Sequence, residues 1–291
     1  MQLNRVRHIV QCLILAVFLS PLVAKAFWGI TPGDWVFFGT LSSSTILGKV
    51  VIVDPFVAAQ SIAASKQLPA ISLVVGSLTI LVVYLLIRGR VFCGWVCPAN
   101  LIFEIVESVA KPVRTYMMKH RGRRLDLAAQ LSRRTKIFVA LGVLGVSALS
   151  GVPVFELISP VGALLRTLVL GAFLGIWVLA ALVVLEIFFP GRIWCRKLCP
   201  LGGFYELIGR LGFFSVKIKS GCISCDKCKV VCLSSPDILD PVIAGDDDRV
   251  RSGDCMLCGK CITACPSKLL SIKACVPFHH PSTIHKEALN K

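Results

Sequence analysis

Eight cysteines in the last third of the chain repeat one short spacing twice. The two runs are Cys222-x2-Cys225-x2-Cys228-x3-Cys232 and Cys255-x2-Cys258-x2-Cys261-x3-Cys265-Pro266. Gaps of two residues let three thiolates converge on one face of a tight loop. This spacing is typical of bacterial proteins with two iron–sulfur clusters, in which the fourth Cys of each run reaches the other cluster. The runs therefore predict two [4Fe-4S] clusters and an electron-carrying module.

Crossed ligation assigns four cysteines to each predicted cluster. The first cluster would be held by Cys222, Cys225, Cys228 and Cys265, and the second by Cys255, Cys258, Cys261 and Cys232. Zinc is the alternative, since paired Cys-x2-Cys knuckles also form tetrahedral sites. A zinc ribbon does not need a third and a fourth Cys at these offsets, so we favour iron. Leu233 follows Cys232 where Pro266 follows Cys265, which makes the first run a slightly altered copy.

The composition excludes an ordinary soluble domain. The chain has 291 residues, of which 55% are hydrophobic and 16% are charged, and its mean hydropathy is +0.78. About twenty apolar residues cross the hydrocarbon core of a bilayer as a helix. Four stretches are apolar and long enough to be predicted as spans: residues 8–30, 69–87, 136–152 and 168–190. We expect an α-helical membrane protein with four transmembrane helices, followed by a C-terminal α+β domain like a bacterial two-[4Fe-4S] ferredoxin.

The basic residues predict the orientation in the membrane. Nine Lys and Arg side chains lie between residues 111 and 136, whereas residues 31–68 contain only Lys49 and Lys66. Basic loops stay in the cytoplasm. We therefore expect a multi-pass protein of a bacterial inner membrane with both termini cytoplasmic, where reducing conditions also suit cluster ligands. The net charge of +16 is spread between apolar segments and indicates a membrane surface, not nucleic acid.

A second group of four cysteines lies in an internal duplication. Residues 90–98 align with residues 192–200, so that Cys93, Cys97 and Pro98 correspond to Cys195, Cys199 and Pro200. Pro is favoured at the first position of a helix, which predicts helices over 99–109 and 201–211. A Cys just before such a helix is stabilised as the thiolate by the helix dipole.

The duplication suggests a function for these four cysteines. Buried Cys often serves as a small hydrophobic residue, but packing alone gives no reason to repeat Cys, spacing and Pro together. We expect two parallel repeats, residues 31–110 and 152–211, whose four thiols form an additional redox or metal site and could hold a third metal centre. We assign no role to Cys12 or Cys275.

These features divide the chain into three parts: a membrane domain over 1–212, a cytoplasmic ferredoxin-like domain over 213–275 and a tail over 276–291. Glu186 lies within an apolar stretch and is a candidate proton acceptor, since carboxylates inside membranes are costly and usually functional. We expect Glu104, Glu107 and Glu206 on the polar faces of interfacial helices.

The combination of motifs resembles the NapH family of ferredoxin-type quinol dehydrogenase subunits. The resemblance rests on four apolar spans, two Cys-x3-Cys-Pro motifs ahead of two ferredoxin runs, and an early segment with Ser42-Ser43-Ser44 followed by Asp54-Pro55. The wider superfamily includes MauN-like proteins and the membrane halves of NosR-like and CcoG-like proteins. The resemblance implies oxidation of menaquinol or ubiquinol and electron delivery toward a periplasmic reductase such as nitrate reductase, through a NapG-like iron–sulfur protein and a cytochrome.

Two other functions stay open at this point. A CcoG-like maturation factor would use its clusters to reduce or assemble a metal centre in a partner enzyme, and it would not turn over quinol. A redox-sensing membrane regulator would carry an output domain. For a quinol dehydrogenase with cytoplasmic clusters and a periplasmic acceptor, electrons must cross the membrane, and Cys93, Cys97, Cys195 and Cys199 are the candidates for that relay.

Overall fold

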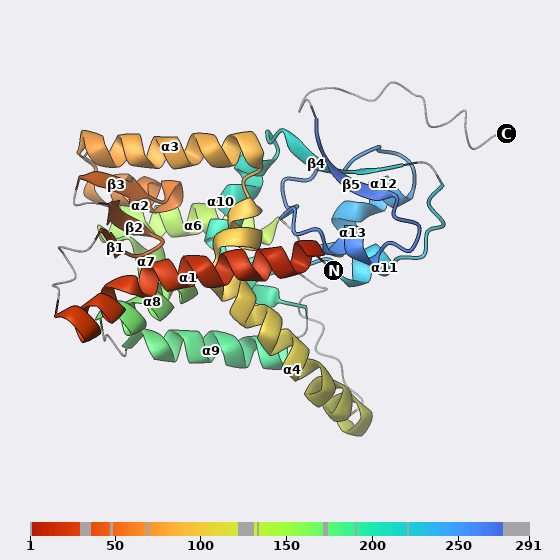
Figure 1. Cartoon of the computed structure of the whole chain (residues 1–291), viewed down its shortest axis with the longest axis horizontal. Coiled ribbons are helices and arrows are strands. Elements are labelled where there is room, and N and C mark those ends of the chain that lie inside the picture. Colours follow the sequence, from red (N-terminus) through yellow and green to blue (C-terminus); the bar gives the residue numbers. More distant parts are fainter. Residues whose placement is uncertain are drawn as a thin grey trace. The chain divides into compact units, whose positions relative to one another are not determined.

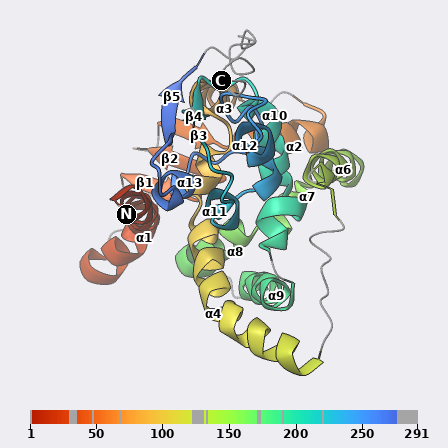
Figure 2. The same cartoon turned by 90° about the vertical axis from the view of Figure 1, so that its right-hand side faces the viewer.

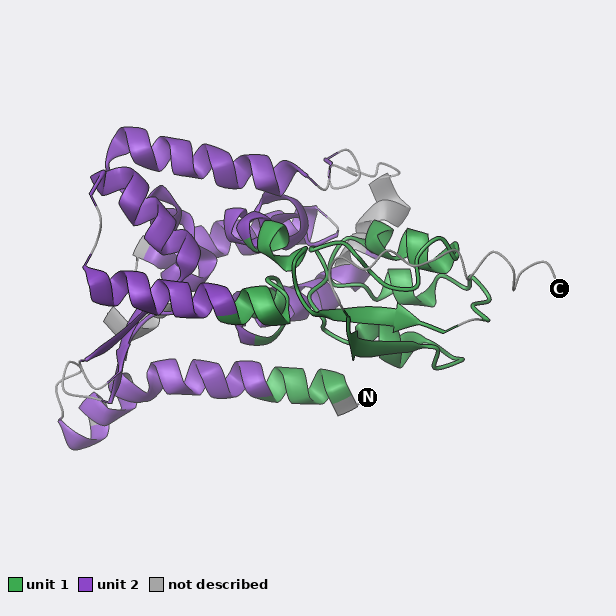
Figure 3. Ribbon diagram, turned by 90° about the horizontal axis from the view of Figure 1, so that it is seen from above, with its two compact units in different colours: residues 1–9, 83–95, 205–291 green, residues 10–82, 96–204 purple. Residues whose placement is uncertain are grey.

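The protein is described from a computed structural model. The described residues are 2–29, 36–46, 49–67, 70–121, 131–132, 134–170, 174–189, 191–219 and 221–275. Arg123, Arg124 and Arg133 of the basic loop and the predicted tail over 276–291 lie outside them. The chain forms two compact units (Figure 3): unit 1 comprises residues 1–9, 83–95 and 205–291, and unit 2 comprises residues 10–82 and 96–204.

Unit 2 is built mainly of helices that run beside one another (Figures 1 and 2). Four long apolar helices lie wholly or mostly in unit 2: α1 (Gln2–Trp28), α3 (Ile71–Ile87), α6 (Thr135–Ser150) and α9 (Leu174–Phe188). Each overlaps one predicted span, and the fourth predicted span, residues 168–190, also covers the end of a further helix. Residues 160–170 form a separate helix, α8 (Pro160–Leu170). Ser159 caps its start, because the Ser159 hydroxyl accepts from Gly162 N at 3.2 Å.

Length distinguishes α1 from the other apolar helices. Within the described chain, the 23-residue segment Leu3–Lys25 alone is long and apolar enough to cross a membrane, whereas Ile71–Ile87, Thr135–Ser150 and Gly175–Phe188 are apolar but shorter. All four helices carry large exposed apolar side chains, including Leu13, Ile71, Leu149 and Trp177. Such side chains are expected to meet lipid or a partner. The fold is therefore a mainly helical one with apolar outer faces, and the number of spans stays a prediction.

A small sheet and two short helices also belong to unit 2. Strands β1 (Phe37–Gly39), β2 (Ser43–Ile46) and β3 (Val50–Val53) pair antiparallel in that order. Asp54 then caps helix α2 (Pro55–Ser65) by accepting from Phe56 N at 2.8 Å. The amide oxygen of Gln60 accepts from Phe155 N at 3.1 Å, at helix α7 (Val154–Ile158). The sequence analysis predicted none of these elements.

Each half of the duplication ends in the same local structure. A π-helical turn, η2 (Phe92–Val96) or η3 (Trp194–Leu198), is followed by a break at the second Cys and by a helix that begins with Pro. These helices are α4 (Pro98–Arg121) and α10 (Pro200–Gly209). Gly203 N donates to Cys199 O at 3.1 Å, and Asn100 N donates to Cys97 O at 3.3 Å. The two predicted helix starts are confirmed, and α4 extends twelve residues beyond the predicted end at residue 109.

Unit 1 contains both cysteine runs in a small α+β fold. Strands β4 (Phe214–Ile218) and β5 (Leu270–Ala274) pair antiparallel, with Val216 opposite Ile272. Four short helices lie between them: α11 (Lys227–Val230), the 3-10 helix η4 (Pro236–Leu239), α12 (Asp240–Ile243) and α13 (Lys260–Ala264). The core includes Val216, Ile238, Leu239, Val242, Val250, Leu257 and Leu270. Residues 1–9, 83–95 and 205–212 belong to the same unit, so the unit is larger than the predicted 213–275 domain.

Candidate iron–sulfur and thiol sites

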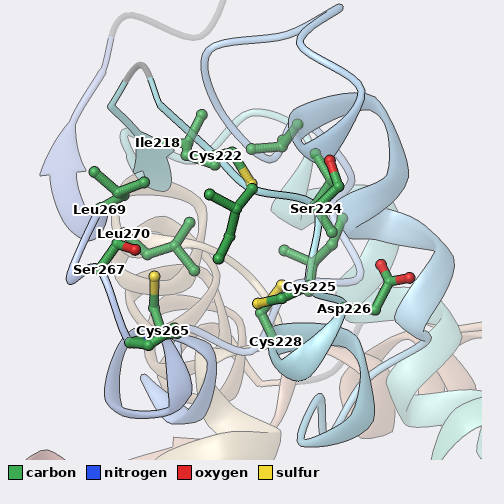
Figure 4. A pocket seen from close by; sticks show the side chains of 15 residues that line it. Ile218, Cys222, Ser224, Cys225, Asp226, Cys228, Cys265, Ser267, Leu269 and Leu270 are labelled. Atoms are coloured by element: carbon green, nitrogen blue, oxygen red, sulfur yellow. The ribbon is translucent and has the colours of Figure 1, made fainter.

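The first site is a cavity of about 490 Å³, counting its opening to solvent. Three cysteines of the first run and one of the second line it: Cys222, Cys225, Cys228 and Cys265. Figure 4 shows their side chains around one space. Most of the other lining side chains are apolar, including Ile218, Leu239, Val242 and Leu270. The structure thus brings together the four residues that crossed ligation assigns to the first cluster.

The second site is more deeply buried. Cys255 and Cys261 are 8% and 9% exposed, whereas Cys222 and Cys225 are exposed. Burial raises the pKa of the Cys261 thiol, and the neighbouring Cys255, Cys258 and Cys232 raise it further. These interactions place in one neighbourhood the four cysteines assigned to the second cluster. The two runs therefore exchange their fourth cysteines in space.

Both runs curl through the same backbone conformation. The residues just before and after the second Cys of each run have positive φ: 49° at Ser224 and 53° at Asp226, and 49° at Leu257 and 73° at Gly259. Residues other than Gly seldom adopt this region, and such strain persists where the surrounding structure requires it. Repetition at identical offsets indicates that the loops are shaped around a common kind of ligand.

The donor sets fit iron–sulfur clusters. Each site offers four thiols in an apolar setting, and clusters are held by four thiolates. Burial raises the pKa of the Cys228 and Cys255 thiols, so cluster binding there would release protons. When bound, such clusters supply one-electron transfer. Among the described residues, no group of three His, Cys, Asp or Glu side chains is placed to hold a single metal ion.

Two arginines that follow α3 attach this segment to the second cysteine run. The Arg88 guanidinium is 3% exposed and donates to the carbonyl oxygens of Phe214 at 2.7 Å, Val250 at 2.9 Å and Ser252 at 2.5 Å. Its charge also opposes the effect of burial on the pKa of the Cys255 thiol. Arg88 therefore joins three backbone positions around the second site.

Arg90 forms a buried ion pair with Asp254, the residue that precedes Cys255. The two side chains are 1% and 0% exposed. Arg90 also donates to the Ser234 hydroxyl at 3.1 Å, and Asp254 accepts from Ser235 N at 3.4 Å. The pair thus links the segment after α3 to both cysteine runs. The sequence analysis aligned Arg90 with Arg192 but did not predict this contact, which joins residues 164 positions apart.

The first Cys-x3-Cys-Pro turn contacts the loop of the second run directly. Trp95 Nε1 donates to Leu257 O at 3.1 Å. A Cβ at Gly94 would lie 2.8 Å from Met256 O, so the two backbones touch there. Arg7 donates to Gly94 O at 3.4 Å from the first turns of α1. Cys93, the neighbour of Gly94, therefore lies in the turn that meets the loop between Cys255 and Cys258.

Three of the four repeated cysteines lie together in unit 2. Burial raises the pKa of the Cys195 thiol, Arg192 opposes that shift, and Glu186, Cys199 and Cys97 add to it. Cys97 and Cys195 also pack against one apolar core that includes Phe103 and Leu182. Cys93 belongs to unit 1 and is not grouped with them by any of these interactions.

The carboxylates show one departure from expectation. Glu104 and Glu107 are half-buried, but Glu206 is 2% exposed, although we expected it on a polar helix face. The reason is close packing within unit 1, where a Cβ at Gly253 would lie 2.0 Å from Glu206 O. Glu186 is also buried, at 2% exposure.

Comparison with known proteins decides the family. A family profile described as "4Fe-4S binding domain" matches residues 69–115 and 170–220. The chain is 36% identical over 263 residues to the methylamine utilization ferredoxin-type protein MauN of Methylorubrum extorquens, covering 89% of this chain and 85% of the relative. It is 31% identical to the ferredoxin-type protein NapH of Escherichia coli, covering 91% and 87% of the two chains. For NapH of Haemophilus influenzae the identity is 30%, with 90% and 86% covered.

The chain belongs to the NapH/MauN family of ferredoxin-type proteins. It is therefore an iron–sulfur electron-transfer protein, as the two cysteine runs predicted. The two segments that match the family profile overlap the two halves of the duplication, 31–110 and 152–211, and contain all four repeated cysteines. They end before Cys222. No solved structure matches the chain.

Proposed function

We propose that this NapH/MauN-family protein oxidises menaquinol or ubiquinol in a bacterial inner membrane and passes the electrons toward a periplasmic reductase, such as nitrate reductase. A quinol gives up two electrons and two protons, so a lipid-accessible site must be coupled to one-electron carriers. Two [4Fe-4S] clusters are such carriers. We assign Cys222, Cys225, Cys228 and Cys265 to the first and Cys255, Cys258, Cys261 and Cys232 to the second.

The observation that carries this proposal is the contact between the first Cys-x3-Cys-Pro turn and the second cysteine run. Trp95 and Gly94 meet the loop that bears Cys255 and Cys258, and the Arg90–Asp254 pair fixes the same two segments. This contact supports an electron path between the second cluster and the repeated cysteines.

The route across the membrane follows from the proposed topology. With both termini in the cytoplasm, the clusters lie on the side opposite a periplasmic acceptor. We propose that Cys93, Cys97, Cys195 and Cys199 relay electrons, through a third metal centre or through thiol redox chemistry. The family profile supports an iron–sulfur role for this region, since its two matches contain these four cysteines.

The partners are proposed from the family. Electrons would leave through a periplasmic iron–sulfur protein like NapG and a cytochrome. The identity to MauN, whose name refers to methylamine utilization, is somewhat higher than that to NapH.

The test is quinol turnover by the full chain. The protein would be purified anaerobically in detergent and mixed with a short-chain menaquinol analogue and an artificial one-electron acceptor. Acceptor reduction would be compared between the parent and a variant in which Cys93, Cys97, Cys195 and Cys199 are changed to Ser. A Cys12→Ser variant is the control, because Cys12 lies exposed on α1 outside both cysteine groups.

The expected result is turnover in the parent and the control but not in the four-cysteine variant. Turnover that survives in the four-cysteine variant would refute the relay. No turnover in any variant, with iron content showing both clusters intact, would refute the quinol dehydrogenase proposal and favour a maturation role. In that case an assembled partner enzyme would stay active after this protein is removed.

A further inference from the structure

A buried arginine in the second repeat has donors that no described residue uses. Arg192 is 3% exposed, and its Nη2 donates to Asn100 O at 3.2 Å and to Asn100 Oδ1 at 2.5 Å. In the part of the chain that the structure describes, Nε and Nη1 of Arg192 have no hydrogen-bond acceptor. A buried cation without a counter-charge is costly, so a compensating group is expected.

In the first repeat the charge of the equivalent arginine is balanced by a carboxylate. Arg90 occupies the equivalent position and pairs with the Asp254 carboxylate at 1% exposure. No described carboxylate forms an ion pair with Arg192. Glu186 approaches the same turn, but its Oε1 accepts from Trp194 N at 2.9 Å. The two copies have thus diverged: the first arginine is used within the fold, and the second retains free donors.

Two further buried donors belong to Asn100, which accepts from Arg192, and to Trp194, two residues after Arg192 in the same turn. The indole Nε1 of Trp194 and the amide Nδ2 of Asn100 are buried and also lack an acceptor among the described residues. Asn100 is 1% exposed, and Trp194 packs against the core that Cys97 and Cys195 also contact. All four unused atoms are N–H donors, so the group that complements them must offer acceptor oxygens. Leaving a buried donor unsatisfied is costly, which favours binding of such a group.

We infer that Arg192, Asn100 and Trp194 bind the headgroup of the quinol through its ring oxygens. The inference rests on the proposed function and names the residues of its substrate site. Two features of unit 2 favour a quinone over another acceptor. Cys195 lies within electrostatic reach of Arg192, and the buried Glu186 carboxylate accepts from Trp194 N in the same turn.

A phospholipid headgroup offers the same chemistry, because phosphate oxygens are also acceptors for arginine. A lipid phosphate, however, has no use for adjacent thiols or for a buried carboxylate. The site combines donors for oxygen with redox-active side chains, and that combination suits a quinol.

The test separates binding from turnover. Purified full-length protein with intact clusters would be titrated with an oxidised short-chain menaquinone analogue, and its Kd would be measured by calorimetry. Bound phospholipid would be quantified in the same preparations by mass spectrometry. The variants are Arg192→Gln and Trp194→Phe; the first repeat has Phe92 at the position of Trp194, so Phe is compatible with this turn. The matched controls are Arg134→Gln and Trp177→Phe, both at exposed positions.

We expect Arg192→Gln to weaken binding about 10- to 100-fold and Trp194→Phe roughly two- to tenfold, since charged hydrogen bonds contribute more than neutral ones. The controls should bind as the parent does. If quinol turnover in the parent is normal but both site variants bind the analogue like the controls, the site is wrong and the proposed function stands. If the parent neither binds the analogue nor oxidises quinol, both fail. Loss of bound phospholipid with unchanged quinone binding would assign the donors to a lipid and overturn the inference.

Discussion

The buried ion pair between Arg90 and Asp254 gives the sharpest prediction. Changing Asp254 to Asn removes the negative charge with almost no change in volume and leaves Arg90 charged at 1% exposure. Breaking one side of a buried pair costs about 3–5 kcal/mol, because an uncompensated charge remains. The Asn carbonyl can still accept from Arg90, so we expect about 3 kcal/mol, the lower end of that range.

The effect should be local and large. Asp254 precedes Cys255 and accepts from Ser235 N, so the segments that open are those carrying the second cluster. A free energy of about 3 kcal/mol corresponds to roughly a hundredfold loss of amide protection. We would measure hydrogen exchange by mass spectrometry across residues 249–262 in protein with both clusters loaded.

A control variant and a double variant that should restore protection are both available in unit 1. Asp247 pairs with Arg251 at 2.7 Å, but the two side chains are 22% and 34% exposed, so Asp247→Asn should cost at most about 1 kcal/mol. Adding Arg90→Gln to Asp254→Asn removes both buried charges and should recover much of the protection. Equal protection in the Asp254→Asn and Asp247→Asn variants would refute the reasoning. So would a double variant whose loss of amide protection equals the sum of the losses in the Arg90→Gln and Asp254→Asn single variants.

Three further experiments test the crossed ligation, the cap of α2 and the close approach at Gly94. Cys265→Ser should remove the cluster of the exposed first site and Cys232→Ser that of the buried second site, each leaving about half of the iron; the opposite assignment by electron paramagnetic resonance would exclude crossed ligation. Asp54→Ala should lower the free energy of opening of α2 by about 1 kcal/mol in hydrogen exchange, since it removes the cap on Phe56 N, and no change would contradict that role. Gly94→Ala places a Cβ 2.8 Å from Met256 O and should cost about 1–3 kcal/mol of local stability, whereas Gly142→Ala, with nothing within 4 Å, should cost nothing.

The sequence allowed the cluster ligands to be grouped because their spacing is local and chemically specific. Three thiols two residues apart meet in one loop whatever the rest of the fold does. The starts of α4 and α10 were predictable for a similar reason, since Pro98 and Pro200 each set the first turn of a helix. Local sequence patterns therefore sufficed to predict the cluster ligands and the starts of these two helices.

Long-range contacts were not predictable in this way. Nothing in the pattern around Arg90 points to a partner 164 residues later, and a lone Arg beside an apolar span looks like an interfacial anchor. Strands of three or four residues, such as Phe37–Gly39, are too short to show a clear alternation of polar and apolar residues. The start of α9 at Leu174 was not predicted, because the apolar run in the sequence continues back into the residues of α8.

The composition of unit 1 has a consequence for biosynthesis. Its three stretches, 1–9, 83–95 and 205 onward, leave the ribosome at widely separated times. Arg88 and Arg90 therefore cannot form their buried contacts until the residues around Val250 and Asp254 have been synthesised. Domains fold as units during synthesis, so this one can close only near the end of translation. The cell must then deliver iron and sulfide to a chain whose apolar helices have already emerged, which makes cluster insertion a late step in the maturation of this protein.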